Sequence, residues 1–168
     1  MQVRHRPLAR SPIASWALRV GTAAALGIDA TVHLQNAAAY DGVKATFTQG
    51  GLFRFEAGVA MAAALLVLLW PRRTAWIAAF LVAASALGAV LLYRYVDVGQ
   101  LGPIPNMYEN TWQVPGKLLS AWAEGAAVVL AGAGLLVHWG GTRNRMTARS
   151  RSSVPSRQDQ DTRTRVRA

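Results

Sequence analysis

Long apolar stretches without charged side chains constrain this chain more than any other feature. The runs 57–71 and 74–93 contain no charged residue at all. About 20 consecutive apolar residues are what a helix needs to cross a hydrocarbon core about 30 Å thick. Only 15% of the residues are charged, well below the share of about a quarter that is usual in soluble domains. The sequence therefore predicts an all-α integral membrane protein.

Four spans are expected to form one four-helix bundle, the membrane domain of residues 18–139. The spans are predicted at about 18–38, 52–70, 74–93 and 118–139. Pro71 and the two arginines after it leave room only for a tight turn, so the second and third spans should form an antiparallel hairpin. The first span is the least apolar of the four, and a cleaved signal peptide is a competing explanation for it.

Small residues four positions apart favour tight helix packing in lipid. Such pairs occur in every span: Gly21/Ala25, Gly58/Ala62, Ala84/Gly88 and Ala127/Ala131.

The placement of positive charge predicts the orientation. The basic arm (1–17) with Arg19, the Arg72–Arg73 turn and the Arg-rich tail (140–168) hold fourteen of the eighteen Lys and Arg residues. Cytoplasmic segments are enriched in these residues. Both termini are therefore expected on the cytoplasmic side of a bacterial inner membrane, with the loops at about 39–51 and 94–117 on the outer side.

The tail is expected to be disordered, because it has almost no apolar residues to bury. A net charge of +10 would indicate nucleic acid in a soluble protein. In a tail beside a bilayer it fits anionic lipid headgroups better. The expected partners are the lipid bilayer and either further copies of the chain or a larger membrane complex, and not nucleic acid.

Cysteine and histidine usage excludes several kinds of site. The chain has no cysteine, so disulfides, thiolate metal sites and thioether-linked haem are excluded. Its only histidines are His5, His33 and His138. Since His33 and His138 are predicted near opposite faces of the membrane, a haem held by two histidines of one subunit is not expected.

Ionisable groups within the first span are the strongest candidates for a site. Thr22, Asp29, His33 and Asn36 fall on one helical face. Asp29 lies about 15 Å beyond Arg19 along the helix, at about 1.5 Å per residue. His33 follows one turn later, so the two side chains can touch. Together they could bind a divalent cation, share a proton or hold a polar ligand, or they could form a structural hydrogen bond that fixes helix packing.

Glu124 is the second acid at a costly depth. It shares a helical face with Lys117 and Ser120. Because a carboxylate facing lipid is expensive, Glu124 is expected to point inward, where it could face Asp29 and His33. Pairing with a nearby cation such as Lys117 is the competing explanation.

The remaining pocket candidates lie near the outer ends of the spans. Glu56 could join the cluster, or it could be a solvated acid in a first helical turn. Arg54 and Arg94 are expected as counter-charges of the pocket, and each could instead pair with Glu124. Asp97, after the third span, completes the set.

The 94–117 segment is expected to fold over the outer mouth of the bundle as a cap. Its Gly and Pro residues favour turns, and its apolar and aromatic content is too high for a flexible linker. An interfacial loop that binds nothing is the alternative. The cap residues singled out are Asn106, Tyr108, Glu109 and Trp112.

Three strings carry a resemblance. They are Gly27-Ile-Asp29-Ala-Thr-Val-His33-Leu, Gly50-Gly-Leu-Phe-Arg54-Phe-Glu56, and Tyr93-Arg-Tyr-Val-Asp97 with the later Gly-Pro-Ile-Pro-Asn-Met-Tyr-Glu109. Over about residues 18–138 the chain resembles uncharacterised four-span integral membrane proteins of actinobacteria. Its architecture is also loosely similar to DoxX-like four-helix membrane proteins. Neither resemblance implies a defined activity.

These observations favour a multispan membrane protein with an outward-facing polar pocket for a cation, a proton or a small polar or lipid ligand. A structural or accessory subunit without a ligand of its own is the alternative. An enzyme that uses Asp29 and His33 as an acid–base pair is the least favoured interpretation.

Overall fold

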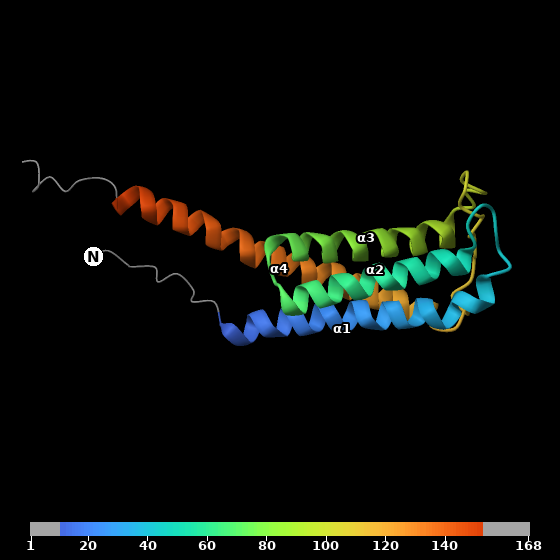
Figure 1. Ribbon diagram of the computed structural model, residues 1–168, viewed down its shortest axis with the longest axis horizontal. Coiled ribbons are helices and arrows are strands. Elements are labelled where there is room, and N and C mark those ends of the chain that lie inside the picture. The colour runs from blue at the N-terminus through green and yellow to red at the C-terminus, as the bar shows by residue number, and fades with distance from the viewer. Residues whose placement is uncertain (1–10, 153–168) are drawn as a thin grey trace, which may run out of the picture. The chain divides into compact units, whose positions relative to one another are not determined.

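The computed structural model describes the backbone of residues 11–152 and the side chains of residues 11–138. Within this part of the chain every long element is a helix (Figure 1). The helices are α1 (Pro12–Ala37), η1 (Ala38–Tyr40), α2 (Gln49–Leu69), α3 (Arg73–Tyr95) and α4 (Lys117–Ser152). Strand-like pairing among the described residues is limited to two isolated bridges, Lys44 with Thr48 and Leu101 with Ile104. The prediction of an all-α fold is confirmed.

Three helices within the described residues are long and apolar enough to cross a membrane. They are α2, α3 and the Lys117–His138 segment of α4. Each lies within a few residues of a predicted span. α1 is just as long, at 26 residues, but it carries Arg19 and Asp29 and is not one of the three.

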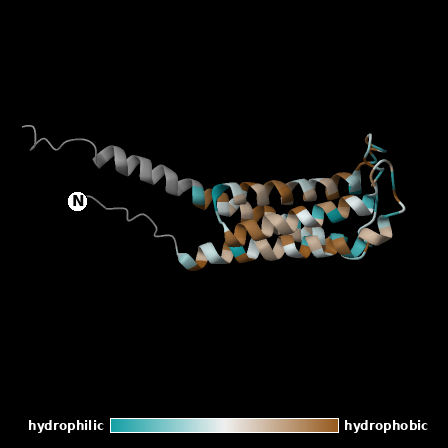
Figure 2. Ribbon diagram, in the orientation of Figure 1, coloured by the Kyte–Doolittle hydropathy of each residue, from teal (hydrophilic) through white to brown (hydrophobic). Residues whose placement is uncertain are grey.

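The distribution of large and small side chains is the one expected in lipid. The helices up to Leu135 pack through a core made mostly of alanine. Many large apolar side chains point outward instead, among them Leu65, Leu69, Leu81, Trp122 and Val129. Lipid tails are as apolar as leucine, so helices in a bilayer gain by close packing of small residues rather than by burying large ones. Figure 2 shows the hydrophobic residues distributed along the helices.

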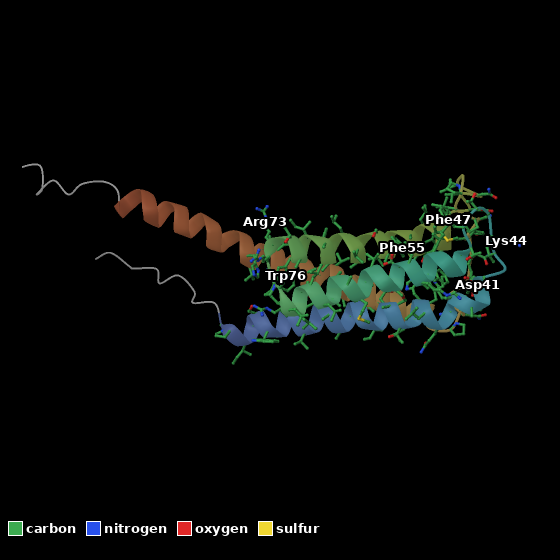
Figure 3. All side chains as sticks on the ribbon, viewed as in Figure 1. Asp41, Lys44, Phe47, Phe55, Arg73 and Trp76 are labelled. Atoms are coloured by element: carbon green, nitrogen blue, oxygen red, sulfur yellow. The ribbon has the colours of Figure 1, made fainter. Side chains whose placement is uncertain are left out.

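Two ends of the bundle differ in character. Figure 1 shows the loop before α2 and the loop between α3 and α4 at one end, opposite the short α2–α3 turn. In Figure 3, Asp41, Lys44 and Phe47 lie at the loop end, and Arg73 and Trp76 lie near the turn. The tight turn after α2 agrees with the predicted hairpin.

The two long loops are tied to each other and to the helices. The backbone amide of Phe47 donates to the carbonyl of Pro103 at 3.0 Å, and the amide of Glu109 donates to the carbonyl of Tyr93 at 3.0 Å. The second bond holds the 96–116 segment against the end of α3. This loop is therefore an ordered part of the bundle end.

Two glycines allow α4 to approach its neighbours. Gly116, just before α4, has a φ of +77°, a left-handed conformation that favours glycine. A Cβ there would lie 2.8 Å from Cγ1 of Val32 on α1. A Cβ at Gly134 would overlap the buried indole ring of Trp76 on α3.

The terminal segments differ from the prediction where they are described. α1 begins at Pro12, a favourable first position for proline, so the end of the expected basic arm is helical. α4 continues to Ser152, whereas disorder was expected from residue 140. No proline interrupts this stretch before Pro155, and arginine and alanine are good helix formers. Residues 1–10 and 153–168 lie outside the described part of the chain.

Candidate functional site

Asp29 and His33 meet on α1, as their spacing of four residues predicts. Nδ1 of His33 lies 3.0 Å from Oδ1 of Asp29 and 3.1 Å from the Asp29 backbone oxygen. Asp29 is only 1% exposed, whereas His33 is partly open. The pair joins a buried carboxylate to an imidazole that reaches the edge of the core.

α4 completes the group with Ser120 and Glu124. The hydroxyl of Ser120 lies 2.6 Å from Oδ1 of Asp29 and 3.1 Å from Oε1 of Glu124. Glu124 is fully buried. We refer to Asp29, His33, Ser120 and Glu124 as the inner cluster. Its polar contacts join α1 to α4.

The inner cluster has fewer donors than its carboxylates can accept. A serine hydroxyl carries one proton, so Ser120 can donate to Asp29 or to Glu124 but not to both at once. Oδ2 of Asp29 and Oε2 of Glu124 are buried without a hydrogen-bond partner. Unmet carboxylate oxygens are costly away from water. A further proton or a cation between the two carboxylates would relieve that cost.

A cavity of about 390 Å³ adjoins the inner cluster. His33 and Ser120 belong both to the cluster and to the cavity wall. The other lining residues come from all four long helices, from η1 and from the 96–116 loop, and most are apolar. They include Val32, Leu52, Phe53, Ala86, Ala89, Val90, Tyr93, Ile104, Met107 and Val114.

Glu56 is the third acid at this cavity. It lines the wall on α2, and its Oε1 atom is buried without a hydrogen-bond partner. Phe53 lies one turn before it and packs edge-on against the His33 ring, with the centroids 5.2 Å apart. Glu56, Phe53 and His33 thus line the same cavity.

A second polar group lies at the loop end of the cavity. The Tyr40 hydroxyl is 2.9 Å from the nearer carboxylate oxygen of Glu109, and Nζ of Lys117 donates to the Glu109 backbone oxygen at 2.9 Å. Burial, together with the Glu109 carboxylate, raises the pKa of Tyr40 to about 12. Tyr40 therefore remains a hydrogen-bond donor at neutral pH. The side-chain amide of Asn36 ties α1 to the cap by donating to the Pro115 carbonyl at 3.0 Å.

The cavity also reaches the outside of the bundle between α2 and α3. Phe55 on α2 lines it and is 71% exposed. Ser85 on α3 lines it and is exposed as well. In a chain that crosses a membrane, this side of the cavity would face lipid.

Arg54 lies apart from the cavity wall. Its guanidinium makes a two-pronged contact with the carboxylate of Asp41, at 2.7 and 2.8 Å. Hydrogen bonding to Arg54 lowers the pKa of Asp41 below its ordinary value. Both side chains are exposed. Arg54 therefore braces the loop before α2 rather than serving as a counter-charge in the cavity.

Arg94 and the cap residues form an aromatic layer at the same end. The Arg94 guanidinium lies 5.0 Å from the ring centre of Tyr95 and 5.5 Å from that of Trp112. Oδ1 of Asp97 accepts from the side-chain amide of Asn106 at 3.1 Å. These contacts fold the cap.

Among the other cap candidates, Glu109 lines the cavity, whereas Tyr108 is 38% exposed. Its amide donates to Oδ1 of Asn106 at 2.9 Å, so Tyr108 helps to shape a turn.

Sequence reasoning missed part of the cavity. The sequence placed Ser120 only on the same helical face as Glu124. Its position four residues before Glu124 was a usable signal that the two side chains are in contact. Ala86, Ala89 and Val90 on α3 gave none, because small apolar residues also occur throughout the core.

Comparison with models of protein families, with curated proteins and with solved structures finds no match to this chain.

Proposed function

We propose that this is a multispan membrane protein that binds a small amphipathic molecule in the cavity beside the inner cluster. The observation that carries the proposal is the cavity itself. The cavity has a volume of about 390 Å³. Its wall is mostly apolar and includes the polar side chains of His33, Ser120 and Glu56. Ligand pockets typically combine an apolar lining with a few polar groups that orient the ligand.

The wall suggests how such a ligand would lie. Its apolar body would occupy the space beside Phe53, Ala86 and Val90, where no charge has to be desolvated. Its polar end would exchange hydrogen bonds with His33 and Glu56. Glu56 has an unpaired buried oxygen, so a ligand that donates a hydrogen bond would be favoured. Entry between α2 and α3, past Phe55, suits a molecule dissolved in the bilayer.

The proposal includes α1 as a fourth span. Its buried residues include the polar Thr22 and Asp29, whereas Val20, Ile28 and Leu34 are exposed. A helix that turns its polar groups inward and its apolar groups outward can lie against lipid despite its modest overall hydropathy. Four spans with the basic segments at one end would place both termini in the cytoplasm. This arrangement also suits the resemblance to actinobacterial four-span proteins, which we retain as a proposal.

Native mass spectrometry of the detergent-purified chain tests the binding. Wild-type protein is expected to carry a small molecule that is released on unfolding. Ala86→Leu should remove it, because Ala86 is a buried part of the cavity wall. Gly88→Leu, on the same helix but where a new Cβ meets open space, should retain it.

A structural or accessory role is the alternative, and the inner cluster itself favours it, because Ser120 joins α1 to α4 through Asp29. In that case no molecule co-purifies, and Asp29→Asn or His33→Ala disrupts the fold. Retention of a molecule in wild type and Ala86→Leu alike would also reject the cavity as its site.

A further inference from the structure

We propose that Asp29, His33 and Glu124 bind a divalent first-row transition-metal ion at the inner end of the cavity. This goes beyond binding of an amphipathic molecule, because the metal would occupy the inner cluster whether or not the cavity is filled. The proposal rests on the geometry of the three side chains, on their unpaired atoms and on their charge.

The three side chains can each offer one ligand atom to a common centre. A nitrogen of His33 and one oxygen from each carboxylate all lie within 4.8 Å of one another. Ligand atoms bound at about 2.1 Å from one ion are separated by about 3 to 4 Å. Nδ1 of His33 and Oδ1 of Asp29 lie 3.0 Å apart, a separation that two ligands of one ion can have once the proton between them has left. Small rotations of the carboxylates would close the remainder.

Independent of this spacing, the site contains buried atoms that lack partners. With both carboxylates ionised, Oδ2 of Asp29 and Oε2 of Glu124 have no hydrogen-bond partner, and the two residues are 1% and 0% exposed. Such atoms are unfavourable in an apolar interior, because a buried polar atom without a hydrogen bond has lost its contact with water and gained nothing in return. A metal ion would satisfy both oxygens.

A divalent ion also suits the charge that the cluster would carry in its metal-binding form. Metal ligands have to be deprotonated, so the two carboxylates and the imidazole would then carry about −2, which a divalent ion cancels. Of the charged residues on the neighbouring helices, Lys117 is engaged with Glu109 and Arg54 with Asp41. Neither of these cations is held against the inner cluster.

The donor set indicates the class of metal. One imidazole nitrogen with two carboxylate oxygens suits Zn²⁺, Mn²⁺ or Fe²⁺, whereas soft ions such as Cu⁺ prefer sulfur, and the chain has no cysteine. Ser120 contacts both carboxylates and would hold them in position. Coordination positions not filled by protein would face the cavity, which His33 and Ser120 line.

The test uses Zn²⁺ and Co²⁺ alone, with the full chain purified without an affinity tag and stripped by a chelator. We expect one ion per chain by elemental analysis after dialysis. Bound Co²⁺ should give visible absorption bands from its coordination sphere. Glu124→Gln and His33→Gln should each weaken binding by about tenfold or more. Asp41→Asn, which alters an exposed acid that pairs with Arg54 away from the inner cluster and the cavity wall, should leave the affinity unchanged.

The outcomes separate this proposal from the one above. Ala86→Leu should lose the small molecule and keep the metal. The metal site is rejected if stripped wild type takes up no stoichiometric ion and gives no Co²⁺ bands. It is equally rejected if folded Glu124→Gln and His33→Gln bind the ion as tightly as wild type. The Co²⁺ spectrum of wild type keeps the test decisive even if the substituted chains do not fold.

Discussion

At the scale of single residues, Ser120 is the contact on which the inner cluster depends. Its hydroxyl reaches carboxylates on two different helices, at 2.6 Å for Asp29 and 3.1 Å for Glu124. Polar contacts between helices in a bilayer contribute about 0.6 kcal/mol on average and up to about 1.7 kcal/mol. Because both acids are buried, Ser120 should fall in the upper part of that range.

Ser120→Ala should therefore lower the free energy of unfolding by about 1 to 2 kcal/mol. Thr31→Val is the matched control, because Thr31 on α1 is exposed and its hydroxyl bonds only to the Gly27 carbonyl of its own helix. It should change stability by less than about 0.5 kcal/mol. Denaturant unfolding in mixed micelles measures both. Equal effects of the two substitutions would contradict the role given to Ser120.

Local spacing made some residue contacts predictable and left others open. Asp29 and His33 lie four apart on a helix, so their contact followed from helical geometry. The partner of Arg54 did not, because Asp41 lies in an irregular loop whose path no periodic pattern fixes. Arg94 was expected to pair with an acid, yet it stacks on aromatic rings of a cap whose fold depends on contacts distant in sequence.

At the scale of the helices, packing depends on small residues whose position on the helix is hard to read from sequence. Ala127 and Ala131 are both fully buried, and Ala25 packs in the same core. Gly58 and Ala62 have the same spacing but are exposed. On helices that are apolar all round, the pattern of small residues does not by itself say which face is inside. The bounds of α2 and α3, by contrast, followed closely from hydropathy and from proline.

Replacing either of two glycines of α4 by alanine should change stability, but in opposite directions. A Cβ at Gly134 would overlap the Trp76 ring, whereas a Cβ at Gly125 meets no atom within 4 Å. Gly134→Ala should destabilise the bundle by about 1 to 3 kcal/mol through overpacking. Gly125→Ala should be neutral or stabilise it by up to about 1 kcal/mol, because alanine favours helix. Thermal unfolding of the two variants provides the comparison, and destabilisation by both would argue against the packing of α4 on α3.

At the scale of the whole molecule, the all-α fold class could be predicted from the sequence. Within the part of the chain that the structure describes, three helices are long and apolar enough to cross a membrane. α1 depends on its partners, since its buried Asp29 is acceptable only when α4 supplies polar contacts. No scale of hydropathy applied to α1 alone contains that information, and for this reason its span is a proposal that rests on packing.

The proposed orientation predicts where single cysteines react. The chain has no cysteine of its own, so each introduced cysteine is the only thiol of the chain that can react. Thr46→Cys, in the exposed loop before α2, should react with a membrane-impermeant maleimide from outside the cell. Ser153→Cys, beyond α4, should react only after the membrane is opened. Reaction of both from the same side would exclude four spans.

The central claim is that α1 packs on α4 in the register that brings the inner cluster together, and an engineered cross-link tests it most directly. A Cβ at Gly116 would lie 3.6 Å from the Cβ of Val32, within the separation of about 3.5 to 4.5 Å found in disulfides. The left-handed φ of Gly116 costs a cysteine about 1 to 2 kcal/mol, which is less than the roughly 2 to 4 kcal/mol by which a disulfide typically stabilises a fold. Leu118 is 51% exposed and provides the control position.

In native membranes, oxidised Val32→Cys/Gly116→Cys should form an intramolecular disulfide, detected as an intact-mass loss of two hydrogens that reductant reverses. Val32→Cys/Leu118→Cys should not. The account predicts a cross-link in the first pair alone. Its absence from that pair, or its equal formation in both, would contradict the α1–α4 packing from which the site and both proposals follow.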